Sequence, residues 1–304
     1  MMTRTRILIL GPFVRQQSIG KTLLLDCPDA TLTISNGSVL RQAIEQLAHG
    51  VVESACTLPA NVLDQMIGHG MVASLPAYSS NVTNFMSEFA SMCDAWVVDI
   101  FLSPFWDLFH SGQATDAQVW TFLCQLYHRT AGADLHNRIA AEQCAEPEIS
   151  ALLLRHYEEE LGHACILADG LRRCGAAAAA HVNMAPLAST RALIDFMVEI
   201  SVDPVAYLGC YGVFHAPSTI RSEKDLLEQF AHYARMYPFA AEAFAAVGRH
   251  AALDYQLEHD HIALEEWVKK VGPPGPRDVA AAARGARGAA LAFRSIFDDC
   301  ARAC

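Results

Sequence analysis

His156-Tyr-Glu-Glu-Glu-Leu-Gly-His163 is a stretch in which carboxylates and imidazoles recur at helical spacing. Glu160 and His163 are an i,i+3 pair and Glu159 and His163 an i,i+4 pair, so either carboxylate can share a helix face with the imidazole. The apolar residues on both sides of the stretch favour an inward-facing helix, although an acidic run is also typical of a solvated helix face. We predict that Glu159, Glu160 and His163 are metal ligands.

A second stretch with the same chemistry is His250-Ala-Ala-Leu-Asp-Tyr-Gln-Leu-Glu-His-Asp-His261. At about 100° per residue, Asp254, Glu258 and His261 lie within roughly 80° of His250 on a helix surface. Carboxylates and imidazoles that face inward from opposing helices hold iron or manganese in helical bundles. We therefore add these four residues to the predicted ligands. The alternatives are an ordinary hydrogen-bonded pair at His250 and Asp254, and a helix that turns toward solvent after residue 257.

Most of the chain between these two stretches and around them also has helical periodicity. A capping box at Thr115 predicts the start of one helix, which carries Tyr127 and His128 as candidate catalytic residues. These two residues would contact the substrate or support the ligands by hydrogen bonds, or else be a core aromatic with a boundary histidine. Further helices are predicted at 88–109, with a bend at Ser103-Pro104, from Pro147 to Gly175, at 240–271 and at 277–301, with a loop at 176–180.

Residues 1–77 have a different pattern. Short β-type runs at 7–10, 21–25 and 31–34 alternate with turn residues and are followed by helical periodicity at 39–47 and 62–67. This order predicts a small α+β, winged-helix-like module at 1–77. A polar linker at 77–83 then leads into a helical bundle at 83–304, so the predicted fold class is mainly α.

The composition excludes several classes of function. A hydrophobic content of 52% with only 18% charged residues indicates an extensive core, and a net charge of −11 without a basic cluster argues against nucleic acid or an anionic membrane as partner. The ten cysteines include no Cys-x-x-Cys pair, and no signal peptide or membrane-spanning run is recognisable. We therefore expect a cytoplasmic protein with reduced thiols. A homodimer is compatible with the sequence, which does not determine the oligomeric state.

Three motifs together resemble the heme-oxygenase-like superfamily. They are Ser103-Pro-Phe-Trp-Asp-Leu-Phe-His-Ser-Gly112, Gln125-Leu-Tyr-His128 and Glu159-Glu-Leu-Gly-His163. This superfamily includes thiaminase II, pyrroloquinoline-quinone synthase and non-heme diiron oxidases. Residues 85–270 look most like the iron-containing branch. The resemblance implies a helical bundle that binds one or two Fe(II) ions, uses O2 as co-substrate and oxidises an amino acid or a fatty acid.

The resemblance also implies a ligand set. The first Glu/His pair of the family falls on Glu159 or Glu160 with His163, and the final motif falls on His250 and Asp254. Two positions depart from the pattern, because Leu257 stands where the family has a histidine and His215 stands where it has a glutamate. Glu258 or His261 could replace the missing ligands. A single-iron site, a rearranged pair of irons and a bundle that has lost its metal all remain open.

Residues 1–77 resemble the precursor-peptide recognition domains of enzymes that modify ribosomal peptides. This resemblance implies that a peptide adds a strand to the edge of the module. The predicted function is therefore iron-dependent, O2-activating oxidation of an amino acid or of a residue in a precursor peptide, in natural product biosynthesis. Three alternatives stay open: a metal-free oxidase of the quinone-synthase type, a thiaminase-like hydrolase for which no cavity Cys–Glu pair is evident, and a non-catalytic peptide-binding scaffold.

Overall fold

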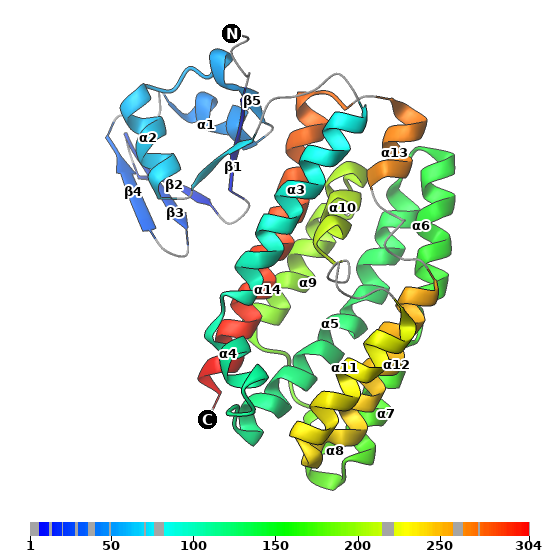
Figure 1. Ribbon diagram of the computed structural model, residues 1–304. Helices are drawn as coiled ribbons and strands as arrows, with labels where there is room; N and C mark the ends of the chain where they lie inside the picture. The colour runs from blue at the N-terminus through cyan, green and yellow to red at the C-terminus, as the bar shows by residue number, and fades with distance from the viewer. Residues whose placement is uncertain are drawn as a thin grey trace.

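The helical periodicity after residue 82 produces a bundle of long helices, and the N-terminal residues form a smaller module beside its upper end (Figure 1). The structure is a computed structural model of the 304-residue chain. It describes residues 6–11, 14–19, 21–27, 30–35, 40–48, 50–69, 71–75, 82–214, 222–257, 264–272 and 274–303.

The strands are β1 (Ile7–Leu10), β2 (Arg15–Ile19), β3 (Thr22–Cys27), β4 (Ala30–Ile34), β5 (Val51–Val52) and β6 (Val72–Leu75). The α-helices are α1 (Arg41–Ala48), α2 (Ala60–Gly68), α3 (Val82–Phe101), α4 (Pro104–His110), α5 (Asp116–Gln143), α6 (Pro147–Glu160), α7 (His163–Arg173), α8 (Ala176–His181), α9 (Ala188–Ile200), α10 (Pro204–Cys210), α11 (Glu223–Met236), α12 (Ala241–Gln256), α13 (Leu264–Val271) and α14 (Pro276–Arg302). Short 3-10 helices are η1 (Glu53–Ala55), η2 (Tyr211–Val213) and η3 (Pro238–Ala240).

The N-terminal module contains two antiparallel sheets of three strands each, in the orders β5-β1-β6 and β2-β3-β4. The predicted strands at 7–10, 21–25 and 31–34 are confirmed as β1, β3 and β4. The prediction missed β2, β5 and β6. Strand β2 has the polar sequence Arg-Gln-Gln-Ser-Ile and becomes a strand because it pairs along its whole length with β3, which is a tertiary contact that local propensity does not report.

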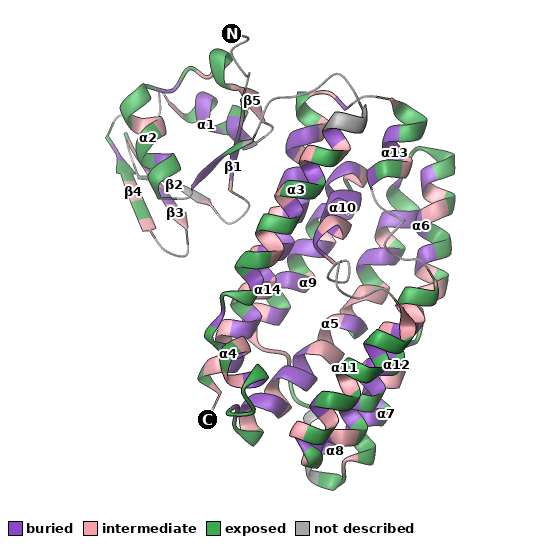
Figure 2. Ribbon diagram, viewed as in Figure 1, coloured by how far each residue is buried: buried purple, intermediate pink, exposed green. Residues whose placement is uncertain are grey.

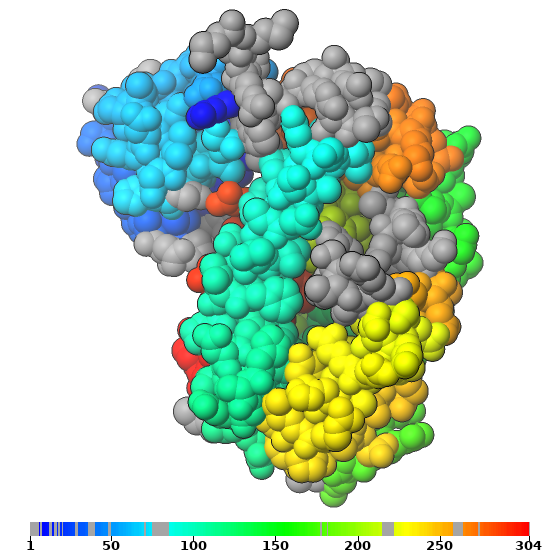
Figure 3. All heavy atoms as spheres, in the orientation of Figure 1, coloured from blue at the N-terminus to red at the C-terminus, as the bar shows by residue number. Residues whose placement is uncertain are grey.

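The bundle is built around α5 and α14. Helix α5 packs against α6, α7 and α9, and α14 packs against α3, α9 and α10. Buried residues line the faces that these helices turn toward one another (Figure 2). On the face shown in Figure 3, α4 lies next to α11, where the Tyr237 hydroxyl donates a 2.7 Å hydrogen bond to the carbonyl oxygen of Phe109. The mainly α prediction is confirmed, as is the capping box at Thr115.

The predicted continuous helix from Pro147 to Gly175 is wrong. Helix α6 ends at Glu160, Gly162 adopts a left-handed conformation with φ of 90°, and α7 begins at His163. Glycine enters this region of φ without the steric penalty that a Cβ imposes. The break changes the direction of the chain between Glu160 and His163, so helical spacing does not determine how these two side chains meet.

Two other helix predictions need correction. The alanine run at 176–180, predicted as a loop, is part of α8, as the high helix propensity of alanine explains. The predicted helix 240–271 is divided into α12, which ends at Gln256, and α13, which begins at Leu264. The N-terminal module contacts the bundle through β1 and β5, which pack against α14. Among the described residues, no helix has the length and apolar character needed to cross a membrane.

Close packing of α7 against α12 depends on Gly170. A Cβ placed there would lie 2.3 Å from the Cβ of Ala246 and 3.1 Å from the carbonyl oxygen of Glu242. We expect Gly170→Ala to lower the free energy of unfolding by about 1–2 kcal/mol. Overpacking costs about 1–3 kcal/mol, and the higher helix propensity of alanine offsets up to about 1 kcal/mol of that cost. Urea denaturation would measure the change.

Gly68→Ala is the matched control for this prediction. It makes the same substitution at a helical glycine with no atom within 4 Å of the added Cβ. Its free energy of unfolding should stay constant or rise slightly. Equal effects of the two substitutions would contradict a steric role for Gly170.

Candidate metal centre

Four side chains with metal-binding chemistry converge in the bundle: Glu160, His163, His250 and Asp254. Glu160 is the last residue of α6, His163 is the first residue of α7, and the other two lie one turn apart on α12. One nitrogen or oxygen atom from each residue lies within 4.8 Å of the corresponding atoms of the other three. Both histidines are buried, and both carboxylates are partly buried.

Asp254 lies between the two histidines. Its Oδ1 is 3.3 Å from Nδ1 of His163, and its Oδ2 is 3.0 Å from Nδ1 of His250. Glu160 approaches the same nitrogen of His163, at 3.4 Å from its Oε2. The two imidazole rings are 5.2 Å apart and nearly perpendicular. Two carboxylates therefore contact two imidazoles in one small volume.

The carboxylates shift the proton equilibria of the cluster. Contacts with Asp254 and then Glu160 raise the pKa of His163 to about 10. Burial alone would raise the pKa of Asp254, but hydrogen bonds with His163 and His250 outweigh it and hold that pKa below its usual value. Without a metal, a protonated His163 between two carboxylates thus balances part of the negative charge.

The donor set fits a divalent transition metal. Imidazole nitrogens and carboxylate oxygens together suit iron, manganese or zinc. Within the described part of the chain, Nε2 of His250 is buried and has no hydrogen-bond partner. Because Nδ1 of His250 contacts Asp254, this second nitrogen is the one left to bind a metal ion or a ligand, as in carboxylate–histidine–metal arrangements.

Not all predicted ligands join the cluster. Glu159 points to another side of α6, where its carboxylate accepts a 2.7 Å hydrogen bond from Arg155. His215, Glu258 and His261 lie outside the described residues. Leu257, the departure from the family motif, follows the last residue of α12.

Tyr127 and His128 lie on α5, with their rings 4.9 Å apart. Neither residue lines either of the two cavities beside the cluster. Burial lowers the pKa of His128, and a hydrogen bond with the backbone of Met184 opposes this shift. The catalytic role predicted for these two residues stays a prediction, and their position gives no direct contact with the four-residue cluster.

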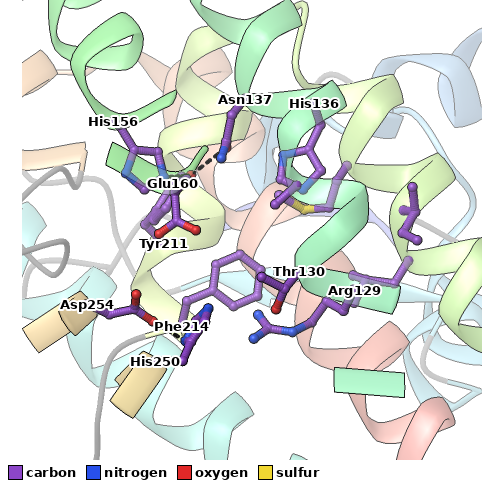
Figure 4. Close-up of a pocket in the computed structure, with 14 residues that line it drawn as sticks. Arg129, Thr130, His136, Asn137, His156, Glu160, Tyr211, Phe214, His250 and Asp254 are labelled. Atoms are coloured by element: carbon purple, nitrogen blue, oxygen red, sulfur yellow. Dashed lines mark hydrogen bonds and ion pairs between the residues drawn. The ribbon is translucent and has the colours of Figure 1, made fainter. Parts of the chain in front are cut away.

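Two cavities meet at the cluster. The first, of about 160 Å³, is lined by polar groups that include His136, Asn137, His156 and Tyr211 (Figure 4). The second, of about 360 Å³, has mainly apolar and aromatic walls. Five residues line both cavities: Arg129, Thr130, Phe214, His250 and Asp254. The candidate ligands His250 and Asp254 therefore lie at the junction of a polar and an apolar chamber.

The polar cavity contains a buried hydrogen-bond network. The Tyr207 hydroxyl donates to Oδ1 of Asn137 and lies 2.7 Å from Nδ1 of His136. The Tyr211 hydroxyl lies 2.7 Å from Nε2 of His156 and 3.2 Å from Oδ1 of Asn137. Since the Tyr207 proton goes to Asn137, Nδ1 of His136 is the donor to the Tyr207 oxygen.

His136, Tyr207 and Tyr211 are electrically neutral members of this network. Burial, reinforced by electrostatic interactions with His156 and Arg129, lowers the pKa of His136 to about 3. Burial also raises the pKa of Tyr207 and of Tyr211 well above the usual value. These three groups can therefore hold and orient protons beside Glu160 without placing another net charge there.

The sequence analysis missed the residues that complete the site. On α5 they are Arg129, Thr130, His136 and Asn137, and elsewhere they are His156, Tyr207 and Tyr211. Their spacing does carry a signal, since Thr130 and Asn137 are two helical turns apart, and His156 and Glu160 are an i,i+4 pair, as are Tyr207 and Tyr211. Polar residues at such spacing in an apolar helix indicate a buried polar stripe.

Comparison with known proteins identifies the fold of this site. No family model matches the chain, and no curated protein matches it. Among solved structures, the chain is similar to a domain of unknown function with a heme oxygenase-like fold from Shewanella denitrificans OS217. The TM-score is 0.53 and the identity 18%, over 73% of this chain and 92% of the other.

The chain is therefore mainly α, with a heme oxygenase-like bundle that follows a small α+β module. The predicted fold class is confirmed. The similarity at 18% identity establishes the fold alone. The protein is thus a heme oxygenase-like bundle in which a His/Glu/Asp cluster could hold a metal ion.

Proposed function

We propose that this protein is a non-heme, Fe(II)-dependent oxidoreductase that uses O2 to oxidise an amino acid or a residue of a peptide. The observation that carries the proposal is the cluster of Glu160, His163, His250 and Asp254, of which His250 and Asp254 line both cavities and Glu160 lines the smaller one. A site of two imidazoles and two carboxylates suits Fe(II) and has fewer protein ligands than octahedral coordination requires. Bound Fe(II) would overcome the spin barrier to reaction with O2, and the substrate that is oxidised would supply the electrons.

The residues around the ligands have separate roles in this proposal. Asp254 orients both imidazoles through its two oxygens. The phenol of Tyr211 and the imidazole of His156 hold a proton on the polar side of the site. The aromatic walls of the larger cavity exclude water and accommodate the apolar part of a substrate.

We propose one iron rather than two at the described cluster. Arg129 lines the same cavities as His250 and Asp254; burial lowers its pKa, and the negative charges of Asp254 and Glu160 oppose that shift. Because a guanidinium stays protonated in proteins, Arg129 supplies a fixed positive charge beside the cluster. A second divalent ion on that side would face this charge at close range in a medium of low dielectric constant.

An anaerobic titration of metal-free protein with Fe(II) tests the proposal. We expect binding to saturate at one ion per chain, and exposure to O2 to give O2 consumption that depends on the iron. Inductively coupled plasma mass spectrometry and an oxygen electrode would measure the two quantities. Absence of iron binding would overturn the proposal and favour the metal-free oxidase, while two ions per chain would show that further residues supply ligands.

A peptide-binding role for the N-terminal module is a second proposal, favoured by its sheet topology. Strand β4 is an edge strand of the β2-β3-β4 sheet among the described residues, and an edge strand can pair with an extended peptide. Fluorescence polarisation with labelled short peptides encoded beside the gene would test it. Peptide binding without iron binding would support the non-catalytic scaffold.

A further inference from the structure

Arg129 is a charged side chain that lines both cavities at their junction. Among the described residues, no carboxylate lies within ion-pair distance of its guanidinium, and its buried Nε has no hydrogen-bond partner. The guanidinium lies 5.3 Å from the ring centre of Phe293. Figure 4 shows it turned toward Phe214 and His250. A guanidinium in such surroundings is costly unless a ligand supplies the missing acceptor.

A second unsatisfied polar atom lies beside this guanidinium. Oγ1 of Thr130 is buried without a hydrogen-bond partner in the described part of the chain. Both residues line both cavities. Unpartnered polar atoms that share one junction point to a bound polar group, since native proteins satisfy almost all their buried polar atoms.

The larger cavity defines the rest of the ligand. Its volume is about 360 Å³, and its walls include the aromatic rings of Trp106, Phe109, Phe122, Phe293 and Phe297. Several of these rings contact one another, with Trp106 and Phe297 at 4.6 Å between ring centres. Such walls bind an apolar body. Of the polar residues in the lining, Gln229 and Tyr233 are hydrogen-bonded to each other. The ligand therefore carries its main polar group at the end that faces Arg129 and Thr130.

We propose that Arg129 and Thr130 bind the carboxylate of the substrate while the aromatic cavity holds its apolar body. Arg129 is then the specificity-determining residue, and the substrate class is an organic monocarboxylate, a class that includes a free amino acid and excludes an internal residue of a peptide. A carboxylate matches the planar fork of a guanidinium. A phosphate is less suitable, because it would bring a second negative charge close to Glu160 and Asp254. This inference rests on the proposed function for the reaction, but the binding step does not require the metal.

Isothermal titration calorimetry with two carboxylates and their matched alcohols tests the proposal. The probes are 3-phenylpropionate against 3-phenylpropan-1-ol and decanoate against decan-1-ol, added to the full chain without metal and again with Fe(II) under nitrogen. For at least one pair, we expect the carboxylate to bind about 10- to 100-fold more tightly than the alcohol, as a charge-assisted hydrogen bond provides. Equal affinities within both pairs, in both forms, would overturn the proposal.

Arg129→Gln should abolish this preference, leaving equal affinities for the carboxylate and the alcohol. The matched control is Arg138→Gln, an exposed position on the same helix, which should retain the preference. Thr130→Val is a second test that removes the hydroxyl at nearly constant shape, and it should weaken carboxylate binding several-fold if Arg129→Gln does not fold. A preference that survives both Arg129→Gln and Thr130→Val would also overturn the proposal.

The outcomes separate this inference from the proposed function. Carboxylate selectivity without iron binding would support the anion site and reject the iron enzyme. Iron binding without carboxylate selectivity would support the iron enzyme and reject the anion site. Arg129 would then act only as a fixed positive charge beside the ligands.

Discussion

Glu160→Gln is expected to weaken Fe(II) binding by more than about 100-fold, because loss of an outer-shell partner alone costs about 10- to 100-fold in metal affinity and Glu160 is proposed to bind the ion directly. The substitution keeps the size of the side chain and replaces a charged oxygen donor by a neutral amide. It also removes one of the two carboxylates that contact His163. Competition with a chromophoric chelator under nitrogen would measure the affinity.

Glu159→Gln is the control, because it makes the same change one residue earlier in the chain. The Glu159 carboxylate contacts Arg155 and lies outside the four-residue cluster, so its loss should leave iron affinity and O2 consumption unchanged. The thermal midpoints of both variants would show whether either substitution disturbs the fold. Iron affinity that falls equally in both variants, or falls only in Glu159→Gln, would show that the cluster is not the binding site.

The contrast between Glu159 and Glu160 also shows where sequence analysis reaches its limit. Either residue can face His163 on a continuous helix, and helical periodicity does not choose between them. The choice depends on the break at Gly162, where the left-handed backbone turns the chain between the two histidine-bearing helices. A glycine just beyond the last helical residue is a typical stop signal, and with it the sequence would have predicted the end of α6.

The misplaced prediction on α5 has a similar geometric cause. Successive helical residues point about 100° apart, so the step from His128 to Arg129 turns the side chain from one face of α5 to another. The motif around Tyr127 and His128 identified the turn of α5 that approaches the cavities. The residues of that turn that line the cavities are Arg129 and Thr130, on another face of the helix. Which face points inward depends on the packing of α6, α7, α9 and α14 around α5, which no local pattern contains.

The pair His250 and Asp254 was easier to predict for a physical reason. Both residues lie within the uninterrupted helix α12, where i,i+4 spacing alone brings Nδ1 of His250 to 3.0 Å from Oδ2 of Asp254. No tertiary contact is needed for that half of the cluster. Its meeting with Glu160 and His163 required the packing of α7 against α12. The residue types were recognisable in the sequence, whereas their convergence depended on the fold.

Metal affinity is expected to increase steeply with pH, by up to about tenfold per pH unit between pH 6.5 and about 10. The contacts with Asp254 and Glu160 keep His163 protonated in the metal-free protein at neutral pH. An ion that binds this imidazole must displace the proton. Adding Mn(II) to weakly buffered protein at pH 7 should therefore release close to one proton per ion, measured with a pH electrode. His163→Asn should remove the metal-linked proton release.

The stability of the metal-free protein should change in the opposite direction over the same range. The pKa of His163 in the folded state lies above its usual value of 6.5, so the stabilisation from protonated His163 is complete below pH 6.5 and is lost as the pH rises toward 10. The pKa of Asp254 is lowered, so its contribution is present above pH 3.8 and is lost at lower pH. Thermal midpoints should thus fall with rising pH without metal and fall less, or rise, with Mn(II). Parallel curves in the two conditions would mean that the ion does not replace the His163 proton, and would separate the metal site from this cluster.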